Sequence, residues 1–246
     1  MTAAPQGPGV AGVAPARAWD GPTRLYHWTQ LALVAGAFYT QWFMDPALDP
    51  TMRLHRWCGY GVLVLLAFRL LWGFAGAPTA RFSHFLRPPG AVARYVARLL
   101  RGGAPAFLGH NPLGALMVAA LLLLLAAQAL SGLFTADSNG IFGGPFAHFD
   151  LLEEPPAWKA RLQAWHHIGA NVIFFFVLVH VLVNLYCQFV KREPLVSAMI
   201  TGVKPAGDYA DAADAPRGSY GARALACLAV AVAATFGGIW LAGGSP

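Results

Sequence analysis

The stretch WHHIGANVIFFFVLVHVLVNLY, residues 165–186, decides the fold that we expect for this chain. It is apolar and long enough to cross a bilayer, which takes roughly 20 helical residues. A histidine near each end makes it a candidate functional segment, because lipid offers an imidazole no partner. On a helix turning about 100° per residue, His166 and His180 share one face and lie about 21 Å apart, whereas His167 points elsewhere. This spacing favours two haems stacked across a membrane.

Composition places the rest of the chain in a membrane as well. Of its 246 residues, 57% are hydrophobic and only 11% are charged, unlike a soluble globular domain. Five segments approach spanning length: residues 27–44, 54–74, 113–135, 165–187 and 222–242. We therefore predict an all-α fold, an integral membrane four-helix bundle with a fifth transmembrane helix at its C-terminal end.

The domain boundaries follow from composition. Residues 1–20 are rich in Ala, Pro and Gly without the apolar core of a secretory signal, and we expect a disordered cytoplasmic tail. The four-helix, two-haem domain is expected over residues 21–203. A polar segment over residues 204–221 is expected to be a flexible linker, and residues 222–246 to form the fifth helix.

Basic residues set the expected topology. Eleven Lys and Arg residues lie in the N-terminal tail, between the second and third segments, or after the fourth, whereas four lie in the two remaining loops. The positive-inside rule then places the N-terminus in the cytoplasm and, after five spans, the C-terminus outside the bacterial inner membrane. The net charge of +6 reflects this asymmetry, so we expect no nucleic-acid partner.

Two further histidines complete the pattern of the first stretch. His27 lies at the cytoplasmic start of the first predicted helix and His55 at the outer start of the second. Because successive helices run in opposite directions, His27 shares a depth with His180, and His55 shares a depth with His166. Each pair can supply both axial ligands of a six-coordinate haem iron. The prediction is an inner haem between His27 and His180 and an outer haem between His55 and His166.

The haems are expected to be of the b type. The three cysteines stand alone, and the chain contains no C-x-x-C-H motif for covalent attachment. Gly59, one turn after His55, and Gly169, three residues after His166, are expected to leave room for a macrocycle. Arg69 lies deep in the second span, where a guanidinium needs an anionic partner. We expect that partner to be a propionate of the inner haem.

A basic segment between the second and third spans predicts contact with membrane lipid. In PGAVARYVARLLRGG, residues 89–103, the arginines recur at helical spacing opposite apolar residues. This pattern is typical of a short helix on an anionic membrane surface, although a solvated connector has the same composition.

Four motifs carry a resemblance to a known family. They are R-x-x-H-W at Arg24–Trp28, H-R-x-x-G at His55–Gly59, G-H-N-P-L-G at Gly109–Gly114, and HHIG at 166–169 with a histidine 14 residues after its first. Over about residues 17–204 the chain resembles the bacterial cytochrome b561 and nickel-iron hydrogenase b-type cytochrome superfamily. The resemblance implies a four-helix core with two haem b groups and gives His27, His55, His166 and His180 as the iron ligands.

The resemblance also implies partners. These are quinone or quinol and a periplasmic redox partner such as a hydrogenase or a c-type cytochrome, which makes the chain an electron-transport subunit of a respiratory chain. Bis-histidine iron has no open position for a substrate, which favours electron transfer. Whether the chain is itself an enzyme or the membrane subunit of an oxidoreductase such as a hydrogenase stays open.

A metal-binding or transport protein that uses the same histidines without haem is the alternative. Such a site is expected to have short-range clusters of ligands or carboxylates beside the histidines. The four histidines are instead far apart in sequence, and no Asp or Glu lies inside a predicted span. Electron transfer is therefore the favoured function.

Overall fold

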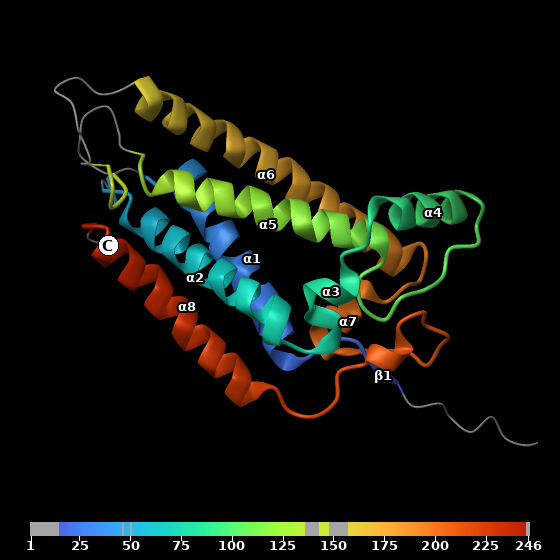
Figure 1. The fold of residues 1–246 in the computed structure, drawn as a ribbon. Helices are drawn as coiled ribbons and strands as arrows, with labels where there is room; N and C mark the ends of the chain where they lie inside the picture. Colours follow the sequence, from blue (N-terminus) through green and yellow to red (C-terminus); the bar gives the residue numbers. More distant parts are fainter. Residues whose placement is uncertain (1–14, 46, 50, 136–142, 148–156, 245–246) are drawn as a thin grey trace, which may run out of the picture.

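A computed structural model describes residues 15–45, 47–49, 51–135, 143–147 and 157–244 of the chain. Five long helices dominate this part: α1 (Gly21–Trp42), α2 (Arg53–Ala75), α5 (Pro112–Gly132), α6 (Ala157–Phe189) and α8 (Gly221–Leu241). They run side by side along one axis (Figure 1). The prediction of an all-α bundle is confirmed.

Within the described residues, four helices are long and apolar enough to cross a membrane: α2, α5, α6 and α8. The protein is therefore an integral membrane protein. The remaining predicted span, the first along the chain, corresponds to α1, which is 22 residues long and lies alongside α2, but polar side chains make up a larger share of it than of the other four helices. Helix α6 has 33 residues and begins eight residues before the segment expected from the sequence.

Local sequence signals set the starts of α1 and α5. The Asp20 carboxylate accepts a 2.8 Å hydrogen bond from the backbone N–H of Thr23, and proline follows in the first turn. Asn111 caps α5 in the same way through the N–H of Gly114, with Pro112 in the first turn. Both use the preference for Asp or Asn at the N-cap and for Pro just inside it. The Asn-Pro of the G-H-N-P-L-G motif is thus a helix start.

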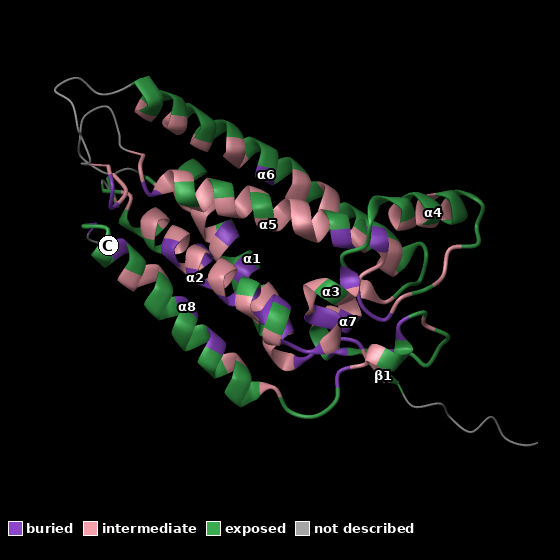
Figure 2. Ribbon diagram, viewed as in Figure 1, coloured by how far each residue is buried: buried purple, intermediate pink, exposed green. Residues whose placement is uncertain are grey.

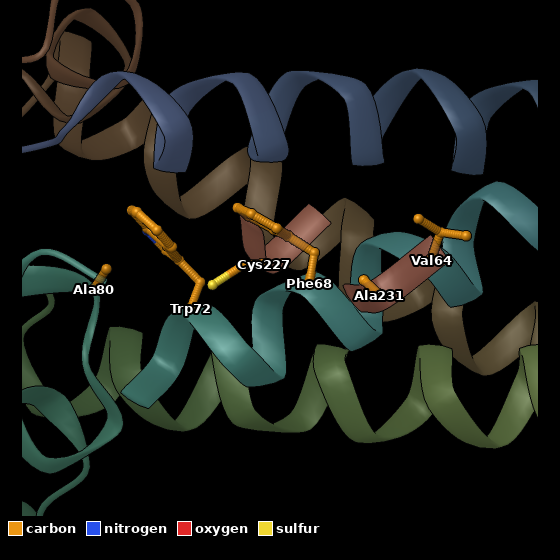
Figure 3. Packing of buried hydrophobic residues seen from close by; sticks show 6 residues of the cluster. All are labelled: Val64, Phe68, Trp72, Ala80, Cys227 and Ala231. Carbon is orange, nitrogen blue, oxygen red and sulfur yellow. The ribbon is translucent and has the colours of Figure 1, made fainter. Parts of the chain in front are cut away.

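Helix α2 is the centre of the bundle. It packs against α1, against α5 and against α8, and α5 packs in turn along α6 (Figure 1). Val64, Phe68 and Trp72 of α2 meet Cys227 and Ala231 of α8 in a buried cluster (Figure 3). Small residues on α8 let the two helices approach closely, which is how helices associate in lipid.

Helix α6, by contrast, lies at the edge of the bundle. Only Ile173 is buried along it, and most of its outer surface is exposed (Figure 2). The exposed side chains are large and apolar, among them Phe175, Leu182 and Val183. An exposed apolar face of this kind suits contact with lipid acyl chains.

One end of the bundle, here called the α4 end, carries the short elements. These are β1 (Ala16–Arg17), η1 (Pro78–Ala80), α3 (Phe82–Phe85), α4 (Pro89–Leu100), α7 (Leu195–Thr201), β2 (Val203–Lys204) and η2 (Ala212–Asp214). Strands β1 and β2 pair antiparallel, with Ala16 opposite Lys204. Helices α1, α5 and α8 begin at this end, and α2 and α6 finish there (Figure 1).

The segment from 204 to 221 makes more contacts than expected of a flexible linker. Asp211 is buried and accepts hydrogen bonds from the backbone N–H groups of Leu108 and Gly109. Lys204 is buried as well and donates a 2.8 Å hydrogen bond to the carbonyl of Phe107. These bonds fasten the segment to the chain just before α5.

The N-terminal tail also differs from expectation in part. Ala16 and Arg17 form strand β1, Asp20 caps α1, and Ala18 between them is fully buried. The remainder of the expected disordered tail, residues 1–14, lies outside the described residues.

Candidate haem-binding sites

The structure brings the four histidines together in two pairs. His27 on α1 faces His180 on α6 with 6.4 Å between ring centroids. His55 on α2 faces His166 on α6, again with 6.4 Å between centroids. The first pair lies toward the α4 end and the second pair toward the opposite end, so α6 contributes one histidine to each.

These separations fit a metal ion between two imidazoles. Imidazole nitrogens bind metals at about 2.0 Å, and a nitrogen lies about 1 Å from its ring centre, so two rings on one iron have centres about 6 Å apart. Both pairs meet this value across helices that are distant in sequence. Direct stacking or hydrogen bonding between the rings would bring them closer. The role of these histidines as iron ligands remains a prediction that the geometry supports.

Hydrogen bonds orient both rings of the second pair. His55 Nδ1 lies 3.1 Å from the carbonyl oxygen of Ala37 and 3.1 Å from Thr40 Oγ1. A carbonyl only accepts, so Nδ1 of His55 carries the proton. Thr40 already donates its hydroxyl proton to the same carbonyl, so it too can only accept from the ring. Nε2 of His55 is left free to bind a metal.

His166 repeats this arrangement from another helix. Its Nδ1 lies 2.9 Å from Ser131 Oγ on α5, and Ser131 donates its own proton to the carbonyl of Gln128. The hydroxyl therefore accepts from Nδ1, and Nε2 again faces away with its lone pair free. Such hydrogen bonds commonly fix the tautomer and orientation of metal-bound histidines.

A cavity separates the two rings of the second pair. It is lined by α1, α2, α5, α6 and residues 143–145, with His55, His166 and Gly59 among the lining residues. A Cβ atom added to Gly59 would meet no atom within 4 Å, so the backbone of α2 borders open space at this point. Gly59 thus borders the cavity, and its place beside a macrocycle remains a prediction.

Gly169 lies against a side chain of α5 and not beside the cavity. It is absent from the cavity lining among the described residues, and a Cβ there would lie 2.3 Å from Oε1 of Gln128. Gln128 also donates a 2.8 Å hydrogen bond to the carbonyl of His166. Gly169 therefore makes room for a glutamine of α5, and the expectation of space for a macrocycle is corrected. Gly132 is the glycine that accommodates His166, because a Cβ there would lie 3.0 Å from the ring.

The rings of the first pair have fewer hydrogen bonds than those of the second. Nδ1 of His27 is buried without a hydrogen-bond partner, and the ring meets Trp28 edge-on at 5.2 Å. Asn184, one turn after His180 on α6, lies 3.4 Å from Nδ1 of that ring. Both rings are thus held mainly by packing.

Arg69 is a buried cation near the first pair. Its guanidinium lies over Phe82 at 4.9 Å and over Phe85 at 5.5 Å, and Nη1 is buried without a hydrogen-bond partner. A buried cation with an open donor favours an anionic ligand. This is what the expected propionate contact requires.

His110, whose role the sequence left open, packs between Trp19 and Phe85 with ring centroids 4.7 and 4.9 Å away. The pKa of His110 is lowered to about 3, mainly by burial and to a smaller extent by the nearby cations Arg69 and Lys204. The imidazole is therefore neutral. Its Nδ1 is buried and has no hydrogen-bond partner.

The alternative metal reading finds little support in the described part of the chain. No group of three or more His, Cys, Asp or Glu side chains lies together there. The histidines occur as two facing pairs, which is the donor set of a six-coordinate haem.

Sequence reasoning missed the polar partners of the second pair. Thr40, Gln128 and Ser131 were assigned no chemistry, although each contacts a site histidine or the helix turn that carries it. Gln128 and Ser131 are the polar side chains of the otherwise apolar α5. A hydroxyl or amide side chain inside a membrane-spanning helix often hydrogen-bonds to a neighbouring helix, and this could have identified Gln128 and Ser131 from the sequence.

Comparison with known proteins agrees with this geometry. A family model described as prokaryotic cytochrome b561 matches residues 18–202. Among curated proteins, the chain is 25% identical over 209 residues to the "Probable Ni/Fe-hydrogenase B-type cytochrome subunit" of Azotobacter chroococcum mcd 1, covering 75% of this chain and 86% of that protein. It is 23% identical to the "Probable Ni/Fe-hydrogenase 1 B-type cytochrome subunit" of Escherichia coli (strain K12), covering 76% and 89%.

The matched region includes α1 to α7 and all four paired histidines, whereas α8 lies beyond it. The family model covers three quarters of the chain, and the features it spans are those of a haem-binding membrane bundle. The chain therefore belongs to the prokaryotic cytochrome b561 family, whose members transfer electrons across membranes through haem b.

Proposed function

We propose that this protein transfers electrons between the quinone pool and a redox partner through two haem b groups. The inner haem is held by His27 and His180, and the outer haem by His55 and His166. The observation that carries the proposal is the equal 6.4 Å separation in both pairs. Haem supplies the one-electron chemistry, and two histidines per iron leave no position for a substrate.

The chain's own residues position and shield the cofactors. Thr40 and Ser131 hold the outer histidines with Nε2 directed into the cavity. Gly59 leaves the cavity open beside the backbone of α2, and Arg69 offers a cation to the inner haem. The rise of α6 between its two histidines separates the sites by about 21 Å along the membrane normal, so that the pairs serve opposite sides of the bilayer.

The topology proposed from the basic residues places the α4 end in the cytoplasm of a bacterium with the protein in its inner membrane. Five spans then put the C-terminus outside. A periplasmic reporter fused after α8 should be active, and one fused after α6 should be inactive.

For the partner we propose a periplasmic hydrogenase or a c-type cytochrome, with quinone accepting or supplying electrons in a respiratory chain. The relatives in Azotobacter and Escherichia coli are named as hydrogenase subunits. Two experiments separate the options. A hydrogenase subunit should copurify with the soluble enzyme, whereas a free-standing cytochrome should be reduced by an added quinol on its own.

The central test is the haem-to-protein ratio of the detergent-purified chain, measured from its pyridine haemochrome spectrum. The expected value is two haem b per chain. A ratio of one would overturn the two-site proposal, and none after haem-replete expression would overturn electron transfer by this chain altogether.

A further inference from the structure

Helix α2 carries a second arginine, partly buried, beside the second histidine pair. Arg56 directly follows His55 and lines the cavity between His55 and His166. Its Nη1 donates a 3.2 Å hydrogen bond to the carbonyl of Gly143, which belongs to the segment closing the cavity. Its Nε is buried and has no hydrogen-bond partner. The Nη1 group of Arg56 is thus hydrogen-bonded, while its Nε–H has no partner.

Tyr60 presents a second open donor to the same cavity. It lies one helical turn after Arg56, so both side chains leave α2 on one face. Its hydroxyl is buried without a hydrogen-bond partner, and only 3% of the residue is exposed. The rings of Trp57 and Phe236 pack around it and hold it in place.

No acid in the described chain pairs with Arg56. Asp49 lies close enough to interact electrostatically with it, but its carboxylate caps the start of α2 by accepting from the N–H groups of Arg53 and Leu54 at 2.9 and 2.8 Å. No ion pair joins Asp49 to Arg56. The Arg56 Nε–H and the Tyr60 hydroxyl are both buried without hydrogen-bond partners, which is costly, and an anionic ligand would offset that cost.

A carboxylate is the ligand chemistry that fits this pair of donors. A guanidinium N–H and a phenol O–H from adjacent turns can each donate to one oxygen of a planar carboxylate. We propose that Arg56 and Tyr60 bind a propionate carboxylate of the haem held by His55 and His166. This inference rests on the proposed function, since it needs a haem at that site.

Helix α2 would then supply one arginine to each haem site. Arg69 near the first pair and Arg56 near the second each keep one buried donor open. Helix α6 correspondingly gives one histidine to each site. A fixed positive charge stabilises the ferrous over the ferric state of a nearby haem, because the ferrous haem carries one positive charge fewer. Arg56 should therefore raise the midpoint potential of the outer haem selectively.

The test is a redox titration of the purified two-haem protein, following the visible haem bands, for Arg56→Gln, Arg56→Lys and Tyr60→Phe. Arg53→Gln is the matched control, because Arg53 is exposed on the same helix one turn earlier and does not line the cavity. The expected result is a fall of the outer midpoint in Arg56→Gln by about tenfold in the ferric-to-ferrous ratio, which is about 59 mV for one electron. Arg56→Lys should restore most of it, and Tyr60→Phe should show a smaller fall.

The outcomes separate this inference from the proposed function. Selective loss of one haem in Arg56→Gln, with both kept in Arg56→Lys and Arg53→Gln, would also support the site. Unchanged potentials and full haem content in Arg56→Gln, or equal shifts in Arg56→Gln and Arg53→Gln, would overturn it while leaving electron transfer intact. A wild-type protein without haem would instead remove the proposed function itself.

Discussion

Ser131 on α5 and His166 on α6 are joined by a 2.9 Å hydrogen bond between Oγ and Nδ1. Because the serine proton is already given to the carbonyl of Gln128, the serine accepts and the imidazole donates. Thr40 stands in the same relation to His55. Two hydroxyls on different helices thus impose one tautomer on both rings of a pair, which prepares both Nε2 atoms for the same metal.

Ser131→Ala should loosen the outer haem. Losing a hydrogen bond behind a metal-bound histidine typically weakens metal affinity by about 10–100-fold and lowers the basicity of the ligand. A less basic ligand stabilises ferric iron less, so the midpoint potential of that haem should rise. Competition with apo-myoglobin measures the affinity and redox titration the potential. Ser131→Thr keeps the hydroxyl and should behave as wild type; equal effects of the two substitutions would remove the role given to this bond.

Each histidine pair should account for one haem. His180→Ala should lose the inner haem and His55→Ala the outer one, so that haemochrome ratios fall from two per chain to one. His84→Ala is the control, because His84 lies at the α4 end outside both pairs and contacts Asp211 and Asp214. Retention of two haems in either pair variant would show that the pairing is wrong.

The pairing could be predicted because it depends on depth alone. Positions along antiparallel helices fix which histidines share a level, and rotation of a helix about its axis does not change that level. The contact of Ser131 with His166 depends on which faces of α5 and α6 meet, and the weakly patterned sequence of α5 leaves this rotation undetermined. Gly169 was misread for the same reason, since the side chain opposite it could not be named before the packing was known.

The contacts made by residues 204–221 were likewise hidden in the sequence. Ala, Gly, Asp and Pro dominate that segment, and such composition predicts a flexible linker. Within this segment, the buried carboxylate of Asp211 accepts hydrogen bonds from two backbone N–H groups about 100 positions earlier in the chain. A long-range contact of this kind leaves no local pattern.

Asp211→Ala should free this segment. It leaves the N–H groups of Leu108 and Gly109 buried without partners, at a cost of roughly 1–3 kcal/mol. The expected results are a lower thermal unfolding temperature in detergent and faster proteolysis between β2 and α8. Asp214→Ala is the control, since that side chain is 49% exposed and only contacts His84. Equal protease resistance of the two variants would contradict an anchoring role for Asp211.

Arg94→Gln with Arg98→Gln should weaken binding of anionic lipid at the α4 end. Both arginines line a shallow hollow with Arg87 and Tyr95, and no hydrogen bond or ion pair within the described chain engages the three guanidinium groups. Each basic residue at an anionic surface contributes about 1 kcal/mol, so the double variant should lose about 2 kcal/mol of binding free energy and retain phosphatidylglycerol or cardiolipin roughly thirtyfold less after purification. The charge-matched control is Arg101→Gln, outside the hollow, against Arg94→Gln alone: Arg101→Gln should retain more lipid, and equal losses in these two single variants would assign the effect to net charge.

His110 should make the fold sensitive to acid. The folded pKa of about 3 lies below the ordinary value of 6.5, so between these values the unfolded chain binds a proton that the folded chain does not. Stability therefore falls as the pH drops from about 6.5, by at most about 2 kcal/mol at pH 5. The charged and titratable groups around His110 are Arg69, Lys204, His27 and His180. His110→Phe keeps a ring between Trp19 and Phe85 but cannot titrate, so its unfolding temperature should drop less between about pH 7.5 and pH 5 than that of wild type. Identical drops in both proteins would place the acid sensitivity in other groups.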